Sequence, residues 1–492
     1  MLANIRRIGK NSSLYFLGQI LTSAIGFFLI PLYTRVLVPG DYGIITIVTA
    51  LVSIFSIFMQ IGLRGALGTF YFDYHQNREQ LRTYVSTIIL FLIPYSLLLM
   101  GVIVLLGKPV LQPLLEGIPF SPYVYLALGI AFCEMIFSII QSIYQVREQA
   151  AKGALINLLY FIINLLLVIY FVVVRGDGAL GNTWARFITS VGFSVLALVL
   201  LRDLLVPRFD LKLLRTSIRF GLPLIPHALS GWILIAIDRL FLNRYTGLSS
   251  VGVYSLGSKL SDVMNVATSS YNAAWVPFFM ATAKEQGREA DGVLARLTTY
   301  YLTAIFFAGL ALSLLAREIL TLMASPQYQQ AYTVVPMLTF GWVFNGMYYA
   351  VVNQLFFMKQ TRFLPLATFG SGILQLLLNY LWIPTYGMLG AAWAMFIAQL
   401  SSFLLTWYLS HKVYPMHFEY GRIARLLAIT GMLLFAGLSL TSMSFWGDLL
   451  IKVALLACFP VGLLLTKFFH REELQMVQAS LAHLMATHSG DA

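Results

Sequence analysis

The amino-acid sequence predicts an all-α, polytopic membrane protein with about fourteen transmembrane helices, arranged as two six-helix lobes followed by two C-terminal helices. Of its 492 residues, 59% are hydrophobic and 11% are charged, which leaves too few polar side chains to cover a soluble protein of this size. The apolar runs are about twenty residues long, the length of a membrane-spanning helix and twice that of a strand in a membrane barrel. An internal repeat of the sequence predicts the two lobes.

Each apolar run of spanning length is assigned one helix, because backbone groups inside lipid must be paired within their own segment. The first run follows a short basic segment, Met1 to Lys10, but it is long and has no small-residue cleavage site. It is therefore interpreted as a retained helix rather than a signal peptide. Between residues 153 and 201 the pattern leaves the number of helices open. The predicted helices are 13–35, 43–64, 84–106, 122–142, 153–174, 179–201, 219–242, 251–276, 297–316, 331–358, 363–385, 388–410, 424–441 and 447–467.

The distribution of basic residues predicts the orientation of these helices, because loops rich in Lys and Arg remain in the cytoplasm. Most of the 32 Lys and Arg fall in the N-terminus, the even-numbered loops and the C-terminus. The opposite loops carry Arg35, Lys108, Arg175, Arg244 and Arg317. Both termini are therefore predicted to be cytoplasmic. The net charge of +12 is explained by this bias and by anionic lipid headgroups, so no nucleic-acid partner is expected.

A repeat with an offset of 209 residues divides the chain into two copies. The segment GALGNTWARF at residues 178–187 aligns with GMLGAAWAMF at 387–396, and the same offset aligns Gly43 with Gly252. The offset spans an even number of predicted helices, so both copies have the same orientation in the membrane. The predicted units are an N-terminal lobe at 1–210, a C-terminal lobe at 211–415, and the last two helices with the tail at 416–492.

The sequence has no signature of an enzyme or of a bound cofactor. It contains no phosphate-binding loop and no His-Glu-x-x-His motif, and none of its loops is long enough for a catalytic domain. Cys133 and Cys458 lie inside apolar runs, which argues against a disulfide framework and a cysteine metal site. A transporter without a cofactor is therefore expected. The sequence leaves open whether H⁺, Na⁺ or the membrane potential drives it.

Six charged residues are singled out at membrane depth within the predicted helices, where a charge costs about 2.5–3.5 kcal/mol on insertion scales. Charges kept at such positions usually face a partner or a water-filled cavity. The arginines and the lysine among them are candidate contacts for an anionic ligand, and the acids are candidates for ion coupling or ion pairing. The six residues are Glu134, Arg186, Asp238, Arg239, Lys259 and Asp262.

Four of these charges also have a structural interpretation. Lys259 and Asp262 share one helical face and can form a salt bridge. Arg239 lies close enough to its helix end to reach the membrane surface. The adjacent Asp238 and Arg239 point about 100° apart and are predicted to find different partners.

The remaining two charges lie in the first lobe. Arg186 is flanked by aromatic residues and aligns with the neutral Met395 of the second copy, so a cavity-facing role is predicted for it. Glu134 is predicted either to bind a coupling cation or to pair with Arg186. Uncharged polar residues within the helices line a hydrated path or bridge helices by hydrogen bonds. They are Gln19, Asn164, His227, Asn353, Gln354, Gln375 and Asn379.

Three segments of the sequence resemble the polysaccharide-biosynthesis flippases, the O-antigen or Wzx-like branch of the multidrug/oligosaccharidyl-lipid/polysaccharide (MOP) exporter superfamily. They are TRVLVPGDYG at 34–43, DRLFLNRYTGLSSVGVYSLGSKL at 238–260 and LNYLWIPTYGMLGAA at 378–392. Together with the helix number and the two lobes, the likeness covers nearly the whole chain. Asp238, Arg239 and Lys259 occupy positions of the family motif.

The resemblance implies a bacterial inner-membrane flippase that moves an undecaprenyl-pyrophosphate-linked oligosaccharide from the cytoplasmic to the periplasmic leaflet by alternating access, for cell-surface polysaccharide assembly. The implied partners are membrane lipids, this lipid-linked glycan and other membrane proteins of polysaccharide assembly. A cation-coupled drug exporter would be expected to carry an acid on its first helix, and none occurs between Ser13 and Arg35. A lipid II flippase would be expected to concentrate basic residues in its first lobe. A membrane-embedded glycan polymerase is the enzyme alternative, although the longest external loop is short.

Overall fold

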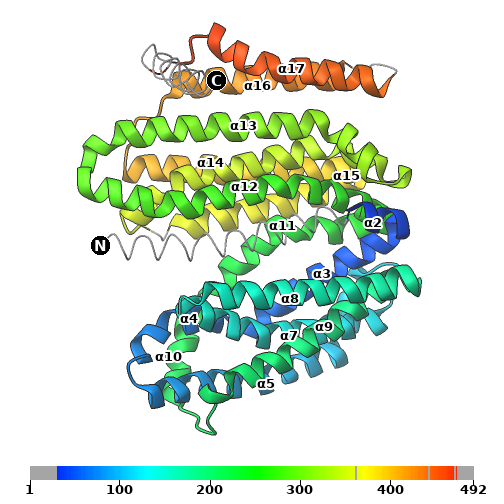
Figure 1. Cartoon of the computed structure of the whole chain (residues 1–492), viewed down its shortest axis with the longest axis vertical. Helices are drawn as coiled ribbons and strands as arrows, with labels where there is room; N and C mark the ends of the chain where they lie inside the picture. The colour runs from blue at the N-terminus through cyan, green and yellow to red at the C-terminus, as the bar shows by residue number, and fades with distance from the viewer. Residues whose placement is uncertain (1–29, 361–362, 441–443, 470–472, 474–492) are drawn as a thin grey trace, which may run out of the picture.

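The computed structural model of the protein describes residues 30–360, 363–440, 444–469 and 473, and these segments form helices and no strand (Figure 1). The predicted all-α membrane class is therefore confirmed. Shorter helical turns include η1 (Gln112–Leu114), the π-helical η2 (Ile169–Val174) and η5 (Pro326–Thr333). The α-helices are α2 (Ile30–Val36), α3 (Pro39–Gln60), α4 (Leu63–Tyr74), α5 (Arg78–Leu106), α6 (Lys108–Leu111), α7 (Phe120–Val146), α8 (Ala150–Val168), α9 (Gly178–Leu201), α10 (Leu211–Gly221), α11 (Leu224–Thr246), α12 (Leu248–Gln286), α13 (Ala290–Met323), α14 (Val335–Phe357), α15 (Leu364–Val413), α16 (Tyr420–Ser439) and α17 (Phe445–Leu465).

Eleven helical segments of the described chain are long and apolar enough to cross a membrane. Two of them each hold two predicted helices: Leu248–Met323 contains α12 and α13, and α15 is kinked at Gly387, where φ is 54°. The stretch that left the count open forms two helices, α8 with η2 and then α9. The first predicted helix, 13–35, lies mostly outside the described residues, so the number fourteen remains a prediction.

Two divisions between helices lie near the ends of predicted helices, and a glycine or a proline lies at each division. The predicted helix 43–64 corresponds to α3, and α4 begins just after Gly62, whose φ is 68°. The predicted helix 219–242 corresponds to α11, which is separated from α10 at Pro223, because a proline ring clashes with the preceding helical turn. The two divisions lie against each other, since a Cβ on Gly62 would come within 2.2 Å of the Gly221 carbonyl oxygen.

The short helix α10 is amphipathic and packs on the helices that precede it in the chain. The Asp210 carboxylate caps its N-terminus by accepting a hydrogen bond from the Lys212 backbone N–H at 2.8 Å. Its buried residues Leu214, Ser217 and Gly221 face α4 and α5. This helix therefore lies with the first half of the chain, although it follows residue 210.

The helices form two bundles with a third layer on one side (Figure 1). The first bundle contains α3 to α5 and α7 to α10, and the second contains α11 to α15. The pair α16 and α17 packs along α13 on the outer side of the second bundle. The predicted domain limits at residues 210 and 415 remain predictions.

The two copies of the sequence repeat have the same local structure. Gly178 and Gly387 begin the repeated segment with φ values of 56° and 54°, a left-handed conformation that glycine adopts without a steric penalty. The ring centroids of Trp184 and Phe187 lie 5.7 Å apart at an interplanar angle of 74°. The equivalent rings of the second copy, Trp393 and Phe396, lie 5.3 Å apart at 82°. The similarity of sequence in these segments therefore reflects a repeated structural unit.

Two ion pairs attach α17 to α13. In the buried pair, Lys452 Nζ lies 2.6 Å from Glu318 Oε1, and both side chains are less than a tenth exposed. In the second pair, the partly exposed Arg317 donates from Nη1 to the buried Asp448 Oδ2 at 3.0 Å. The buried charges require partners, so the two pairs fix the position of α17 on α13.

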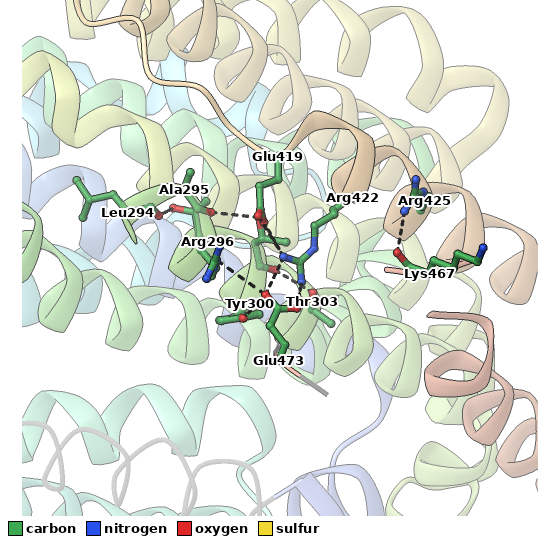
Figure 2. Close-up of polar contacts among 12 residues, drawn as sticks. Leu294, Ala295, Arg296, Tyr300, Thr303, Glu419, Arg422, Arg425, Lys467 and Glu473 are labelled. Atoms are coloured by element: carbon green, nitrogen blue, oxygen red, sulfur yellow. Dashed lines mark hydrogen bonds and ion pairs between the residues drawn. The ribbon is translucent and has the colours of Figure 1, made fainter. Parts of the chain in front are cut away.

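A second set of charges attaches α16 to the other end of α13, and Figure 2 shows these contacts. Arg422, on α16, lies 3.0 Å from Glu419 and 3.1 Å from Glu473. The hydroxyl of Tyr300, on α13, donates a hydrogen bond to Glu473 at 2.5 Å. The two C-terminal helices are thus held against α13 by charged contacts at both of its ends.

Replacing Lys452 by alanine should destabilise the protein by about 3–5 kcal/mol, because Glu318 would remain buried and unpaired. Thermal unfolding of the purified protein in detergent would measure this as a lower Tm. The double variant Lys452→Met with Glu318→Leu should recover most of the loss, since it removes both charges. Arg202→Ala is the control, because Arg202 is 78% exposed. An unchanged Tm for Lys452→Ala would show that this pair does not hold α17.

Candidate functional site

A cavity of about 900 Å³ lies between the first bundle and α12 of the second. One end is formed where α3 and α7 end, and the exposed side chains of Arg64 and Gln145 lie there, so the cavity is open at this end. These helix ends are the ones predicted to face the cytoplasm. The lining residues are Val52, Ser53, Ser56, Gln60, Arg64, Glu134, Phe137, Ser138, Gln141, Gln145, Asn157, Tyr160, Arg186, Ser269, Ser270 and Ala273.

Polar residues spaced three and four apart along α3 share one face, and Ser53, Ser56 and Gln60 of this face line the cavity. On an α-helix this spacing places side chains on one face. The face begins at Thr46, whose hydroxyl bonds to that of Ser255 on α12 at 3.2 Å. A short polar side chain in an otherwise apolar helix can thus face water while the opposite side packs against other helices. The face consists of Thr46, Thr49, Ser53, Ser56 and Gln60.

Arg186 lies at the closed end of the cavity and is paired with Glu134. Its Nε and Nη2 atoms donate to the two carboxylate oxygens of Glu134 at 2.9 and 3.1 Å, and its Nη1 donates to the Thr49 hydroxyl at 3.2 Å. The hydroxyl of Tyr160 donates to Glu134 at 3.1 Å. The side chains of the pair are 27% and 25% exposed. Arg186 therefore lies on the cavity wall and is paired with Glu134, and the roles of the two residues in binding or ion coupling remain predictions.

Asp238 and Arg239 pair with each other, so the prediction that they find different partners is wrong. The Arg239 Nη1 atom lies 3.1 Å from Asp238 Oδ1, because the long arginine side chain bends back although the two Cβ atoms point apart. Nη2 donates to the Ser258 hydroxyl at 3.1 Å, and the Tyr254 hydroxyl donates to Asp238. Arg239 is 14% exposed and does not line the cavity.

Lys259 and Asp262 lie on the face of α12 that continues toward Ser269 and Ser270 of the cavity wall. Lys259 is exposed and Asp262 is half-buried. Within the described part of the chain they form no ion pair with each other or with other residues, which differs from their structural interpretation as a salt bridge. Neither residue lines the cavity.

The opposite end of the molecule is closed by contacts that are related by the repeat. The Thr34 hydroxyl donates to the Met323 carbonyl at 3.5 Å, and the Asn243 side chain donates to the Leu114 carbonyl at 3.3 Å. At the 209-residue offset Thr34 is equivalent to Asn243, and Leu114 is equivalent to Met323. Each contact therefore joins the residues that are equivalent to those of the other contact. Such exchange is the property of a two-fold axis, here along the membrane normal.

Two glycines permit the closest approach of the bundles at this end. A Cβ on Gly43 would lie 2.2 Å from the Leu248 carbonyl oxygen, and one on Gly252 would lie 1.9 Å from the Pro39 carbonyl oxygen. Gly43 is equivalent to Gly252 and Pro39 to Leu248 in the repeat, so these two contacts are also equivalent to each other. The Thr46–Ser255 hydrogen bond joins two equivalent residues, so it lies on the axis itself. At this closed end the backbones of the two bundles are therefore in direct contact. Toward the opposite end the bundles separate and enclose the cavity.

Several residues of the cavity are absent from the sequence-based predictions. Arg64, Gln60, Gln141 and Asn157 line it, but they lie near predicted helix ends, where polar residues are ordinary. The signal that could have found this wall is the polar face of α3. Of the predicted polar path, Gln19 lies outside the described residues, and none of the others lines the cavity. Four of them are instead buried: Asn353, Gln354, Gln375 and Asn379.

Within the described segments, three or more His, Cys, Asp or Glu side chains do not gather at any point where they could hold a metal ion. The polar lining therefore consists of amides, hydroxyls, the Arg186–Glu134 ion pair and the guanidinium of Arg64 around an open space. Two helical bundles related by an internal two-fold axis, with a polar cavity between them, define the class of protein as a multi-pass membrane transporter.

Comparison with protein-family models identifies the family. Residues 8–283 match the model of the polysaccharide biosynthesis protein family, and the chain belongs to this family. It is a membrane transporter of the flippase type in polysaccharide biosynthesis, within the MOP superfamily that the sequence motifs indicated.

Two relatives share the sequence at a distance. The "Lsg locus putative protein 1" of Haemophilus influenzae is 23% identical over 299 residues, which cover 57% of this chain and 68% of the relative. The "Probable low-salt glycan biosynthesis flippase Agl15" of Haloferax volcanii is 23% identical over 425 residues, which cover 85% of this chain and 86% of the relative.

Solved structures share the fold. The "Lipid II flippase MurJ, inward closed conformation" aligns with a TM-score of 0.73 at 14% identity, covering 91% of this chain and 98% of that chain. The inward-facing conformation of a multidrug resistance MATE family transporter of the MOP superfamily aligns with a TM-score of 0.62 at 17% identity, covering 85% and 96%. At these identities the likeness concerns the fold.

Proposed function

We propose that this protein is an alternating-access flippase that moves an undecaprenyl-pyrophosphate-linked oligosaccharide from the cytoplasmic to the periplasmic leaflet of a bacterial inner membrane. The observation that supports the proposal most is the 900 Å³ polar cavity between the bundles, open at one end and closed at the other by two-fold related contacts. A transporter of this kind exposes one site to each side in turn. With both termini in the cytoplasm, the open end faces the compartment in which lipid-linked glycans are made.

The chemistry of the lining agrees with a polar headgroup as cargo. Amide and hydroxyl side chains both donate and accept hydrogen bonds, as the hydroxyls of a sugar do. Of the three predicted headgroup contacts, Arg186 lines the cavity, whereas Arg239 is held by Asp238 and Ser258 outside it. Lys259 also lies outside the lining, so Arg186 is the one of the three that reaches the cavity. The related proteins named as flippases for lipid II and for a glycan support a lipid-linked sugar as substrate class.

Transport assays with the purified protein in liposomes would test this function. Undecaprenyl-pyrophosphate-linked oligosaccharide extracted from the host is placed in one leaflet, and its appearance in the other is measured with a sugar-specific probe that cannot cross the membrane. The expected result is translocation that needs the protein and is weaker for lipid II. Cells lacking the protein should accumulate single lipid-linked units on the cytoplasmic side. Export of units that stay short would instead indicate loss of a polymerase, and would contradict the proposal.

A further inference from the structure

We infer that the open end of the cavity is a two-part headgroup site, in which Arg64 binds the pyrophosphate and the amides of Gln60, Gln141, Gln145 and Asn157 bind the hydroxyls of the glycan. The inference rests on the proposed function and assigns its substrate contacts. It concerns residues other than those of the family motif, because the motif charges Arg239 and Lys259 do not line the cavity.

Arg64 is the cation of the cavity that has no acidic partner. Two arginines line the cavity, and the fork of Arg186 is occupied by both carboxylate oxygens of Glu134. Arg64 instead donates from Nε to the Ser142 hydroxyl at 3.2 Å, and within the described residues it forms no ion pair. The residue is exposed and lines the cavity, so a ligand that enters at the open end can reach its guanidinium group. Such a fork of donors fits the oxygens of a phosphate group.

The four amides surround the same end of the cavity from three helices. Gln60 ends α3, Gln141 and Gln145 are one turn apart on α7, and Asn157 lies on α8. The Asn157 side chain donates to the Gln141 side-chain oxygen at 3.4 Å. The Gln141 Nε2 atom makes no hydrogen bond to any described residue. A set of neutral groups that both donate and accept suits a polyhydroxyl ligand and not a hydrocarbon.

The position of the site agrees with the shape of a lipid-linked glycan. Arg64 lies in the first turn of α4, near the level where α3 and α7 end, which by the predicted orientation is the level of the cytoplasmic headgroups. A pyrophosphate bound there would leave its lipid tail in the membrane and direct its sugars into the cavity. The carboxylate on the cavity wall belongs to Glu134, and its pairing with Arg186 removes its repulsion toward the phosphates. Ser269 and Ser270 of α12 face the glycan from the second bundle.

Binding of three probes to the full-length protein in detergent separates the two parts of the site. The probes are undecaprenyl pyrophosphate without sugar, the host's undecaprenyl-pyrophosphate-linked oligosaccharide, and phosphatidylglycerol. We expect Arg64→Ala to lose about tenfold in affinity for the first two, with part of the affinity kept in Arg64→Lys. We expect the double variant Gln141→Ala with Asn157→Ala to lose about tenfold in affinity for the glycan-bearing lipid. Its affinity for undecaprenyl pyrophosphate without sugar should not change. Arg202→Ala and Gln149→Ala, whose side chains lie outside the cavity lining, are the matched controls.

The possible outcomes distinguish this site from the proposed function. If the wild-type protein binds and translocates the glycolipid but Arg64→Ala does so equally well, the site is wrong and the function stands. If the wild-type protein binds neither polyprenyl probe, the function itself fails. If Arg64→Ala lowers the affinity for phosphatidylglycerol as much as the affinity for the pyrophosphate lipids, Arg64 is a general contact for lipid phosphates. This result overturns the assignment. Folding of each variant is checked by its elution from a size-exclusion column.

Discussion

A disulfide between Thr46→Cys and Ser255→Cys should abolish transport, and reduction should restore it. The two hydroxyls are 3.2 Å apart and belong to opposite bundles, so sulfurs at these positions can meet. The residues lie beside the packed glycines at the closed end, and a covalent bond there would keep the bundles together. If transport requires this end to open, we expect a loss of more than about tenfold under oxidising conditions in the liposome assay.

A cross-link within one bundle is the control for this experiment. Ser261→Cys with Thr339→Cys joins α12 to α14 inside the second bundle, where the two hydroxyls are 3.3 Å apart. Oxidation of this pair should leave transport nearly unchanged, because it does not join the bundles. Cys133 and Cys458 are replaced by alanine in both variants so that no other disulfide forms. Full transport by the oxidised Thr46–Ser255 variant would show that the closed end does not separate.

Neutralising either member of the Arg186–Glu134 pair should impair both the stability and the activity of the protein. The remaining charge would lie in a low-dielectric wall without its partner, at a cost of about 2–3 kcal/mol. We therefore expect Arg186→Gln and Glu134→Gln each to lower the Tm and to reduce transport about tenfold. Thermal unfolding in detergent and the liposome assay measure the two effects separately.

The double variant Arg186→Gln with Glu134→Gln separates a structural role from a role in binding. Both charges are then absent, so the Tm should return close to that of the wild-type protein. If Arg186 contacts the anionic headgroup, transport should stay low despite the recovered stability. If both the Tm and transport recovered, the Arg186–Glu134 pair would have a structural role and no role in binding. The exposed pair of Arg175 and Asp177 is the control, and Arg175→Ala should change the Tm little.

The sequence predicted most helices to within a few residues, because the length of an apolar run is a local property. It started the helix of α11 five residues early, at 219, and assigned no helix to most of α10, because α10 is amphipathic rather than apolar. It also ended helices near the membrane surface, whereas α12 and α13 continue well beyond the apolar segment. In those extensions, helix-forming residues and contacts between neighbouring helices maintain the helix without lipid.

The candidate site was predicted in part. Arg186 was singled out because a charge at membrane depth needs a partner or water, and the structure supplies both Glu134 and the cavity. Arg64 was overlooked, because a basic residue at the end of a helix is explained by the orientation rule alone. Arg239 was predicted to be a ligand contact from its charge and motif, but the flexible side chain bends back onto Asp238.

By itself, the sequence determined the membrane class, the course of the helices and the internal repeat. Each of these follows from a pattern along the chain, namely the apolar runs and the segments that recur at the 209-residue offset. The tertiary structure alone decided which charges are paired, which face of α3 meets the cavity, and where the two bundles are packed together. The physical reason is distance: Arg186 and Glu134 are 52 residues apart in the chain, and their side chains meet only after α7 and α9 pack. A hydrogen-bonded ion pair needs its donor and acceptor within about 3 Å of each other, and the spacing of residues along the chain does not show which charges come that close.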